Sequence, residues 1–139
     1  IIVFENSIEQ GEKDKDTEKE LKPNYFIYRS LDTIRVIGKS KPVKTFELLG
    51  KVGCPEETSL KTLVEIWEHA RQCYLNMQWD EAIRYFTECL KFEPHHPDRD
   101  PGSKTTPSHV YIDRCEAYKK NPPVAAGDIW DGVFTATEK

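Results

Sequence analysis

The fold is decided by one stretch, LVEIWEHARQCYLNMQWDEAIRYFTECLKFEP, which runs from Leu63 to Pro94. Its pattern of apolar and polar residues predicts two amphipathic helices joined by a tight turn. Small residues stand where two antiparallel helices would touch, and aromatic residues stand where they would splay apart. The residues at these spacings are Ala70, Trp79, Ala82, Phe86, Cys89 and Pro94. We therefore expect this helix pair to organise the rest of the chain.

The helix pair resembles one tetratricopeptide repeat, a unit of about 34 residues. The resemblance rests on Ala70 in the first helix, on Trp79 at the start of the second, and on Ala82, Phe86, Cys89 and Pro94 after it. The chain departs from the repeat pattern at Ile66 and Cys73, where an aromatic residue is common, and at Met77, where the turn usually has glycine. Because each repeat buries its apolar face only against a neighbour, and about three are normally needed, we expect another part of the chain to cover this one.

The composition is that of a polar globular domain. The chain has 139 residues, of which 37% are hydrophobic and 32% charged, and its formal net charge is -4. We expect no nucleic-acid partner, because no basic face dominates. We also expect no membrane span and no signal peptide, because no apolar run approaches the required length. The first residue is Ile1 rather than Met, so we expect a fragment, a trimmed product or the visible part of something longer. We expect a cytoplasmic location, because the single, widely spaced cysteines are typical of reduced thiols.

The cysteines and histidines form no recognised ligand pattern. The four cysteines are spread singly, and two of them fall on apolar helix faces, where a free cysteine behaves as a small hydrophobe. We expect reduced thiols and no metal; the alternative is a zinc site that combines cysteines with His69 or His109. A loop reading HHPDRDPGSK also has metal-ligand types, but they are common in polar turns. The residues concerned are Cys54, Cys73, Cys89, Cys115, His95, His96, Asp98 and Asp100.

The first fifty residues predict β-structure. The apolar run Ile1 to Phe4 predicts a strand, and the charged run Gly11 to Lys22 predicts a solvated segment. Three further strands are expected over Tyr25 to Tyr28, Thr33 to Ile37 and Val43 to Leu49, from aromatic and β-branched content and from alternation. The last two would form a hairpin, because GKSKP, residues 38–42, has the glycine and proline of a turn.

A second resemblance covers this part of the chain. YRSLDTIRVIGKSKPVKTFELLG, Tyr28 to Gly50, is similar to the closing strands of a bacterial class III adenylate or guanylate cyclase catalytic domain, and IIVFENSIEQ resembles the strand and helix before them. The matching residues are Arg29, Leu31, Asp32, Val36, Gly38, Lys39, Pro42, Val43, Phe46, Glu47 and Leu48. The tail matches too, through Asp113, Arg114, Cys115, Asn121, Pro122, Pro123, Trp130, Asp131, Gly132 and Val133. The combined resemblance spans nearly the whole chain.

The resemblance also implies what this chain lacks. Class III cyclases use two metal-binding aspartates, an arginine and an asparagine, and in the family these precede the stretch that begins at Ile1. We therefore expect no catalytic residue and no cofactor in this chain, with Mg²⁺ or Mn²⁺ serving the parent enzyme. Ile37 stands where many members have a phosphate-contacting lysine. Lys39 is the second lysine of that motif and a weak candidate for substrate phosphate, although a solvated hairpin lysine is the alternative.

The C-terminal part offers a cover for the helix pair. Thr106, Pro107 and Ser108 predict a helix start, and Asn121 to Pro123 predict its end. Val110, Tyr111, Cys115 and Tyr118 would share one face of this third helix. We expect the tail with Trp130 and Phe134 to fold back over the helices or the sheet, because burial of each ring contributes about 1.5–3 kcal/mol.

Together these features predict an α+β protein. Residues 1–50 would be the remnant of a cyclase catalytic domain, 51–57 a linker, and 58–139 a helical tail that begins with Thr58 or Ser59 as the N-cap. The expected function is a regulatory or assembly region of a class III nucleotide cyclase, in cyclic nucleotide biosynthesis and signal transduction. Its partners would be the remainder of the catalytic domain and a second copy in a homodimer. The alternative is a non-enzymatic module that binds a peptide or protein on its helix pair.

Overall fold

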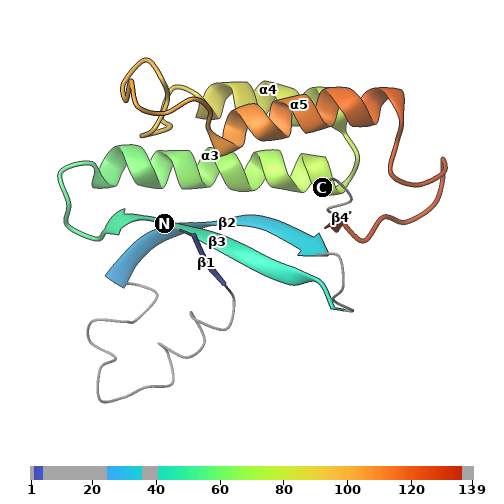
Figure 1. Ribbon diagram of the computed structural model, residues 1–139, viewed down its shortest axis with the longest axis horizontal. Coiled ribbons are helices and arrows are strands. Elements are labelled where there is room, and N and C mark those ends of the chain that lie inside the picture. Colours follow the sequence, from blue (N-terminus) through green and yellow to red (C-terminus); the bar gives the residue numbers. More distant parts are fainter. Residues whose placement is uncertain (1, 5–24, 36–40, 136–139) are drawn as a thin grey trace. The chain divides into compact units, whose positions relative to one another are not determined.

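The computed structural model describes residues 2–4, 25–35 and 41–135, and it has an α+β architecture in which antiparallel strands precede three helices (Figure 1). The chain divides into two compact units: Ile1–Lys61 with Gly132–Lys139, and Thr62–Asp131. The elements are β1 (Ile2–Phe4), β2 (Phe26–Arg35), β3 (Val43–Lys51), α3 (Glu57–Leu75), α4 (Trp79–Cys89), α5 (Pro107–Lys120) and β4 (Phe134–Thr135).

The first unit is built on a sheet with the strand order β1-β3-β2-β4. β3 lies between β1 and β2 and pairs antiparallel with both, whereas β4 pairs with β2 in parallel. The strand expected over Ile1 to Phe4 is confirmed as β1. The predicted turn over residues 38–42, the charged run over 11–22 and the phosphate candidate Lys39 fall wholly or partly outside the described residues.

The prediction of two separate strands over Tyr25 to Tyr28 and Thr33 to Ile37 was wrong. Phe26 to Tyr28 and Thr33 to Arg35 both belong to the single strand β2, which pairs with β3 from Phe26 to Ile34. Residues 36 and 37 lie outside the described part of the chain. Register shifts occur between Ile27 and Tyr28 and again between Ser30 and Asp32. A β-bulge inserts an extra residue without ending the strand, so the polar segment that resembled a break is accommodated within one long strand.

The first helix begins earlier than expected. α3 already includes Glu57, so neither Thr58 nor Ser59 is its N-cap. The Glu57 carboxylate accepts a hydrogen bond from the Gly53 backbone N–H at 2.7 Å and forms an ion pair with Lys61 at 2.6 Å. Glu57 therefore ties the turn after β3 to the first turn of α3. Gly53 has a φ of 96°, which a glycine adopts without strain.

The second unit contains most of α3, together with α4, α5 and the first part of the tail. The turn between α3 and α4 is tight, because the Gln78 N–H reaches back to the Cys73 carbonyl at 2.9 Å. Met77 has a φ of 60° in this turn, at the position where the repeat pattern usually has glycine. The backbone thus takes the left-handed conformation of the turn even though the residue is a methionine.

The third helix starts and stops where the sequence predicted. Thr106 is the N-cap of α5 and accepts the His109 N–H, Pro107 follows, and Asn121 lies beyond the last helical residue. One part of the prediction was wrong, because Val110 is 42% exposed. Ser108, three residues before Tyr111, is buried in its place. The helix is rotated so that a polar residue, with a hydrogen-bonding partner, takes the inner position.

Candidate functional site

The helix-pair residues proposed from the sequence lie mostly in the interior. Ala70 on α3 and Ala82, Phe86 and Cys89 on α4 are fully buried, whereas Trp79 is half-buried at the start of α4. The Trp67 ring meets the Phe86 ring edge-on, with 5.1 Å between centroids. The small residues and these two aromatic rings are thus buried together between α3 and α4.

The aromatic residues that fill the core of α3 were missed in the sequence. Ile66 and Cys73 stand where the repeat pattern often has aromatic residues, but the buried aromatic residues are Trp67 and Tyr74, one position later. Their spacing of seven residues, two helical turns, was the available signal. Tyr111 from α5 reaches both, with ring centroids 5.2 Å from Trp67 and 4.8 Å from Tyr74. α5 therefore covers the apolar face that a lone repeat would leave open.

The tail adds Trp130 to the same cluster. Its ring lies 5.1 Å from Tyr74, 5.9 Å from Trp79 and 5.5 Å from Tyr118, measured between centroids. Phe134 belongs instead to β4, opposite Ile34 of β2. The expectation that the tail folds back is thus met within each unit, by Trp130 on the helices and by Phe134 on the sheet.

Two arginines lie against the tyrosines of this cluster. Arg71 donates from Nη1 to the Tyr111 hydroxyl at 2.9 Å, and Arg114 donates from Nη1 to the Tyr74 hydroxyl at 3.2 Å. The Arg114 guanidinium carbon is also 4.7 Å from the Tyr111 ring centroid. Guanidinium groups favour such stacking on aromatic rings. The interior of the second unit is therefore aromatic and cationic together.

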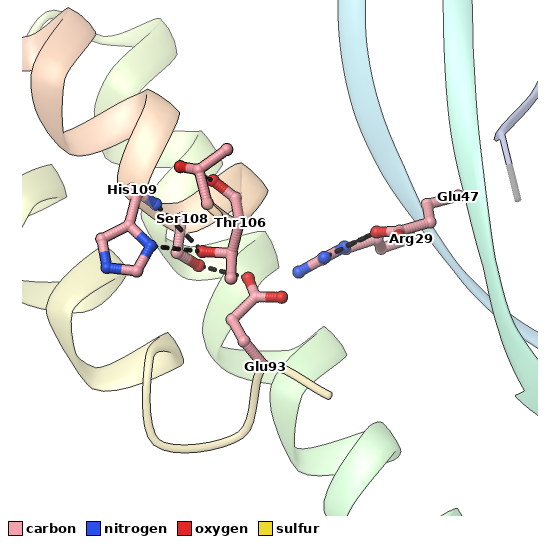
Figure 2. A network of polar contacts seen from close by, with 7 residues as sticks. Arg29, Glu47, Glu93, Thr106, Ser108 and His109 are labelled. Carbon is pink, nitrogen blue, oxygen red and sulfur yellow. Dashed lines mark hydrogen bonds and ion pairs between the residues drawn. The ribbon is translucent and has the colours of Figure 1, made fainter. Parts of the chain in front are cut away.

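A buried carboxylate lies near the start of α5. Figure 2 shows the Ser108 hydroxyl donating to Glu93 Oε2 at 2.5 Å, and the Thr106 hydroxyl within 3.0 Å of His109 Nδ1. Glu93 and Ser108 are both buried. Arg99 donates to the Glu93 and Leu90 carbonyls after α4, which satisfies backbone acceptors beyond the helix end. These contacts fix the loop between α4 and α5.

The first unit has one ion pair that joins two residues of the cyclase-like motif. Arg29 on β2 contacts Glu47 on β3 through Nε at 2.9 Å and Nη2 at 2.6 Å, as Figure 2 shows. These two residues face each other in the strand register. Nearby, the Thr45 hydroxyl donates to the Asp32 carbonyl at 3.3 Å. Arg29 and Glu47 of the motif thus have a side-chain contact across the strand pair.

An open depression of about 430 Å³ lies at the end of the helix pair. It is lined by Met77, Gln78, Trp79, Asp80, Glu81 and Lys119. Lys119 of α5 forms an ion pair with Asp80 at 2.6 Å, and the hydrogen bond that the lysine donates to Asp80 raises the pKa of the lysine. Two of the three charged residues in the lining, Asp80 and Lys119, pair with each other, and the third, Glu81, pairs with Arg84. The depression therefore offers a mixed polar and aromatic surface whose charges are paired.

Two of the cysteines, Cys73 and Cys115, do not have the properties of nucleophiles. Burial raises the pKa of the Cys115 thiol to about 12 and also raises the pKa of Cys73. The thiolate is the reactive form, so both are poorly reactive at neutral pH.

In the described ranges 2–4, 25–35 and 41–135, no group of three or more His, Cys, Asp and Glu residues is placed to hold a metal ion. The loop histidines contact acids or backbone instead: His95 pairs with Asp100 at 2.9 Å, and His96 accepts the Asp98 N–H.

No helix in the described part of the chain is both long enough and apolar enough to cross a membrane. No family model matches the sequence, and comparisons with curated proteins and with solved structures found no match. The functional argument therefore rests on the residues and their contacts.

Proposed function

We propose that this chain is the C-terminal regulatory or assembly region of a class III nucleotide cyclase. The observation that carries the proposal is the contact between Arg29 and Glu47, two residues of the cyclase-like motif, across β2 and β3. Residues that form one buried interaction are expected to occur together in a motif, because removal of either leaves the other charge without that partner. The contact thus gives a structural reason for the sequence resemblance in the first unit.

The tail motif supports the same proposal. Of its residues, Trp130 packs on Tyr74 and Trp79, Cys115 is buried, and Arg114 stacks on Tyr111. Gly132 has a φ of 76°, a conformation that favours glycine. Trp130, Cys115 and Arg114 contribute to the closure of the helical unit. In this proposal the tail motif therefore preserves a fold rather than a catalytic group.

The proposed role of the chain is structural and regulatory. By the resemblance, the aspartates that hold Mg²⁺ or Mn²⁺ would come from the remainder of the catalytic domain, and the described residues have no equivalent metal-binding group. β2 and β3 would complete the catalytic sheet of the parent enzyme. The helical unit would regulate the enzyme, support its homodimer or dock it to another protein, within cyclic nucleotide signalling in the cytoplasm.

The test is cyclic nucleotide production by the full-length polypeptide that carries this chain, with ATP or GTP and with Mg²⁺ or Mn²⁺. Three variants are compared with it: deletion of Thr58 to Lys139, Trp130→Ala, and Ile129→Ala. Ile129 is the matched control, because it precedes Trp130 and is 96% exposed. We expect deletion and Trp130→Ala to change the rate in the same direction, and Ile129→Ala to leave it unchanged. Absence of cyclic product from a folded full-length protein would overturn the proposal.

A non-enzymatic binding module remains the second candidate. Gln72 on α3, Asn76 in the turn after it and Arg84 on α4 are exposed, and an exposed polar row on the helix pair is the feature that favours this function. A triple substitution of these residues by alanine would weaken capture of a peptide partner but leave cyclic nucleotide production unchanged. The reverse result would support the cyclase proposal.

A further inference from the structure

Arg71 is a recessed cation whose partner is a phenol rather than an acid. Its side chain is 8% exposed, and its Nη1 donates to the Tyr111 hydroxyl at 2.9 Å. Within the described ranges, no carboxylate lies within ion-pair distance of Arg71. Arginines that are almost fully buried are normally paired with acids, because removal of the charge from water is costly.

The remaining donors of Arg71 are not sealed in the protein. Nε and Nη2 make no protein hydrogen bond, yet no fully buried side-chain nitrogen or oxygen among the described residues lacks a partner. These donors therefore reach solvent. They form one edge of the guanidinium fork, with the geometry that matches the two oxygens of a carboxylate.

A second guanidinium lies on the same tyrosine. Arg71 is 5.8 Å and Arg114 4.7 Å from the Tyr111 ring centroid. Arg114 is held further by its hydrogen bond to the Tyr74 hydroxyl. The hydrogen bonds of Arg71 to the Tyr111 hydroxyl and of Arg114 to the Tyr74 hydroxyl restrict both side chains, which lowers the entropy lost when a ligand binds.

Arg84 shows the ordinary arrangement in the same unit. Its guanidinium carbon is 4.7 Å from the Tyr85 ring centroid, as close as Arg114 is to Tyr111. It differs in being 62% exposed and paired with Glu81 at 2.5 Å. The exposed Arg84 thus has an acidic partner, although an exposed charge stays in water and does not require one. Arg84 is therefore a matched control for Arg71.

We infer that Arg71, with Arg114 beside it on Tyr111, is a binding site for a carboxylate group of a ligand. The open Nε and Nη2 edge of Arg71 receives the two carboxylate oxygens, and the Arg114 guanidinium lies against the same tyrosine ring. A monoanionic carboxylate matches this single free edge better than a phosphate dianion, which is bound by more donors. The site does not depend on the proposed cyclase function.

The test is a titration of the whole chain with sodium acetate, followed through the arginine Nε–Hε signals in ¹H–¹⁵N NMR spectra. We expect the Arg71 signal to shift with saturation, and the Arg84 signal to stay in place. Arg84→Gln should leave the affinity unchanged. Arg71→Lys keeps the charge but removes the fork, so it should weaken acetate binding by about tenfold, as read from the Tyr111 ring signals.

Two further titrations decide the ligand class. Sodium chloride at the same ionic strength should not shift the Arg71 signal with saturation, and inorganic phosphate should bind more weakly than acetate. An equal response to chloride, tighter binding of phosphate, or no saturable response to acetate would each overturn the assignment. If Arg71→Lys fails to fold, the wild-type comparison of the Arg71 and Arg84 signals still decides the outcome.

Discussion

Trp130 packs edge-on against the buried ring of Tyr74, with 5.1 Å between the ring centroids. This contact joins the tail to the middle of the helical unit. Since Trp130 also meets Trp79 and Tyr118, its removal would expose the edges of three aromatic rings.

Trp130→Ala should therefore destabilise the protein. We expect the free energy of unfolding to fall by about 2–3 kcal/mol, less than for a fully buried tryptophan because Trp130 is half-buried. Urea denaturation followed by circular dichroism measures the change. Ile129→Ala serves as the control and should alter stability by less than about 0.5 kcal/mol. Equal effects of the two substitutions would contradict the packing of Trp130.

Met77→Gly should stabilise the helix pair. Met77 has a φ of 60°. This left-handed conformation destabilises a residue with a Cβ atom by about 1 kcal/mol relative to glycine. Part of this gain is lost, because glycine has more freedom in the unfolded chain. The midpoint of urea unfolding should rise for Met77→Gly and fall for Gln78→Gly, whose φ is -91°. A lower midpoint for both would show that the methionine side chain matters more than its backbone.

Thr106→Ala should weaken the start of α5. The Thr106 side chain accepts the His109 N–H at 3.2 Å, and loss of such an N-cap costs about 1 kcal/mol. Thr106→Ser retains the hydroxyl and should restore most of the stability. The neighbouring Thr105 is exposed, so Thr105→Ala is the control. Thermal unfolding of the three variants measures the difference, and a Thr106→Ser variant as unstable as Thr106→Ala would argue against the cap.

Glu47→Gln should destabilise the strand pair. The substitution keeps the size of the side chain but removes the charge that faces the buried Arg29, at a cost of about 3 kcal/mol. Lys44→Gln on the same strand is exposed and should have little effect. A double-mutant cycle with Arg29→Met isolates the coupling between the two residues. A coupling energy near zero would mean that the pair contributes nothing to stability.

The stability of the protein should fall in strongly alkaline solution, in part through Cys115. Burial raises the pKa of this thiol from 9.0 to about 12. Between these two pH values the unfolded chain releases the proton while the folded chain retains it, so the unfolding free energy decreases as the pH rises. Cys115→Ala should show a shallower decline over this window in urea denaturation. Identical slopes for the two proteins would rule out this contribution.

The local pattern of the sequence was sufficient for the helices and for most of the strands. The turn after α3, the start of α5 at Thr106 and Pro107, and the strand β1 all follow from residues within a few positions of each other. Such elements depend on side-chain periodicity, on caps and on turn residues, which are local properties. The packing of a third helix on the pair also followed, because a lone repeat needs a cover.

Contacts between distant residues required the tertiary structure. The two predicted strands form the single strand β2, because register shifts in its pairing with β3 accommodate the segment between them. The pairing of Phe134 with Ile34 joins segments that are far apart in the sequence. Ser108 is buried and Val110 exposed because the rotation of α5 is set by its partner Glu93.

The arrangement of Arg71 and Arg114 around Tyr111 has the same origin. On a linear sequence each arginine is one charge on an amphipathic helix, and nothing in its neighbours indicates that it faces a tyrosine from another helix. The sequence by itself determined where the helices and strands form, because hydrogen-bonding pattern and periodicity are local. Only the tertiary structure decided that the buried Arg71 meets the hydroxyl of Tyr111, because that depends on how side chains forty residues apart meet in the packed core.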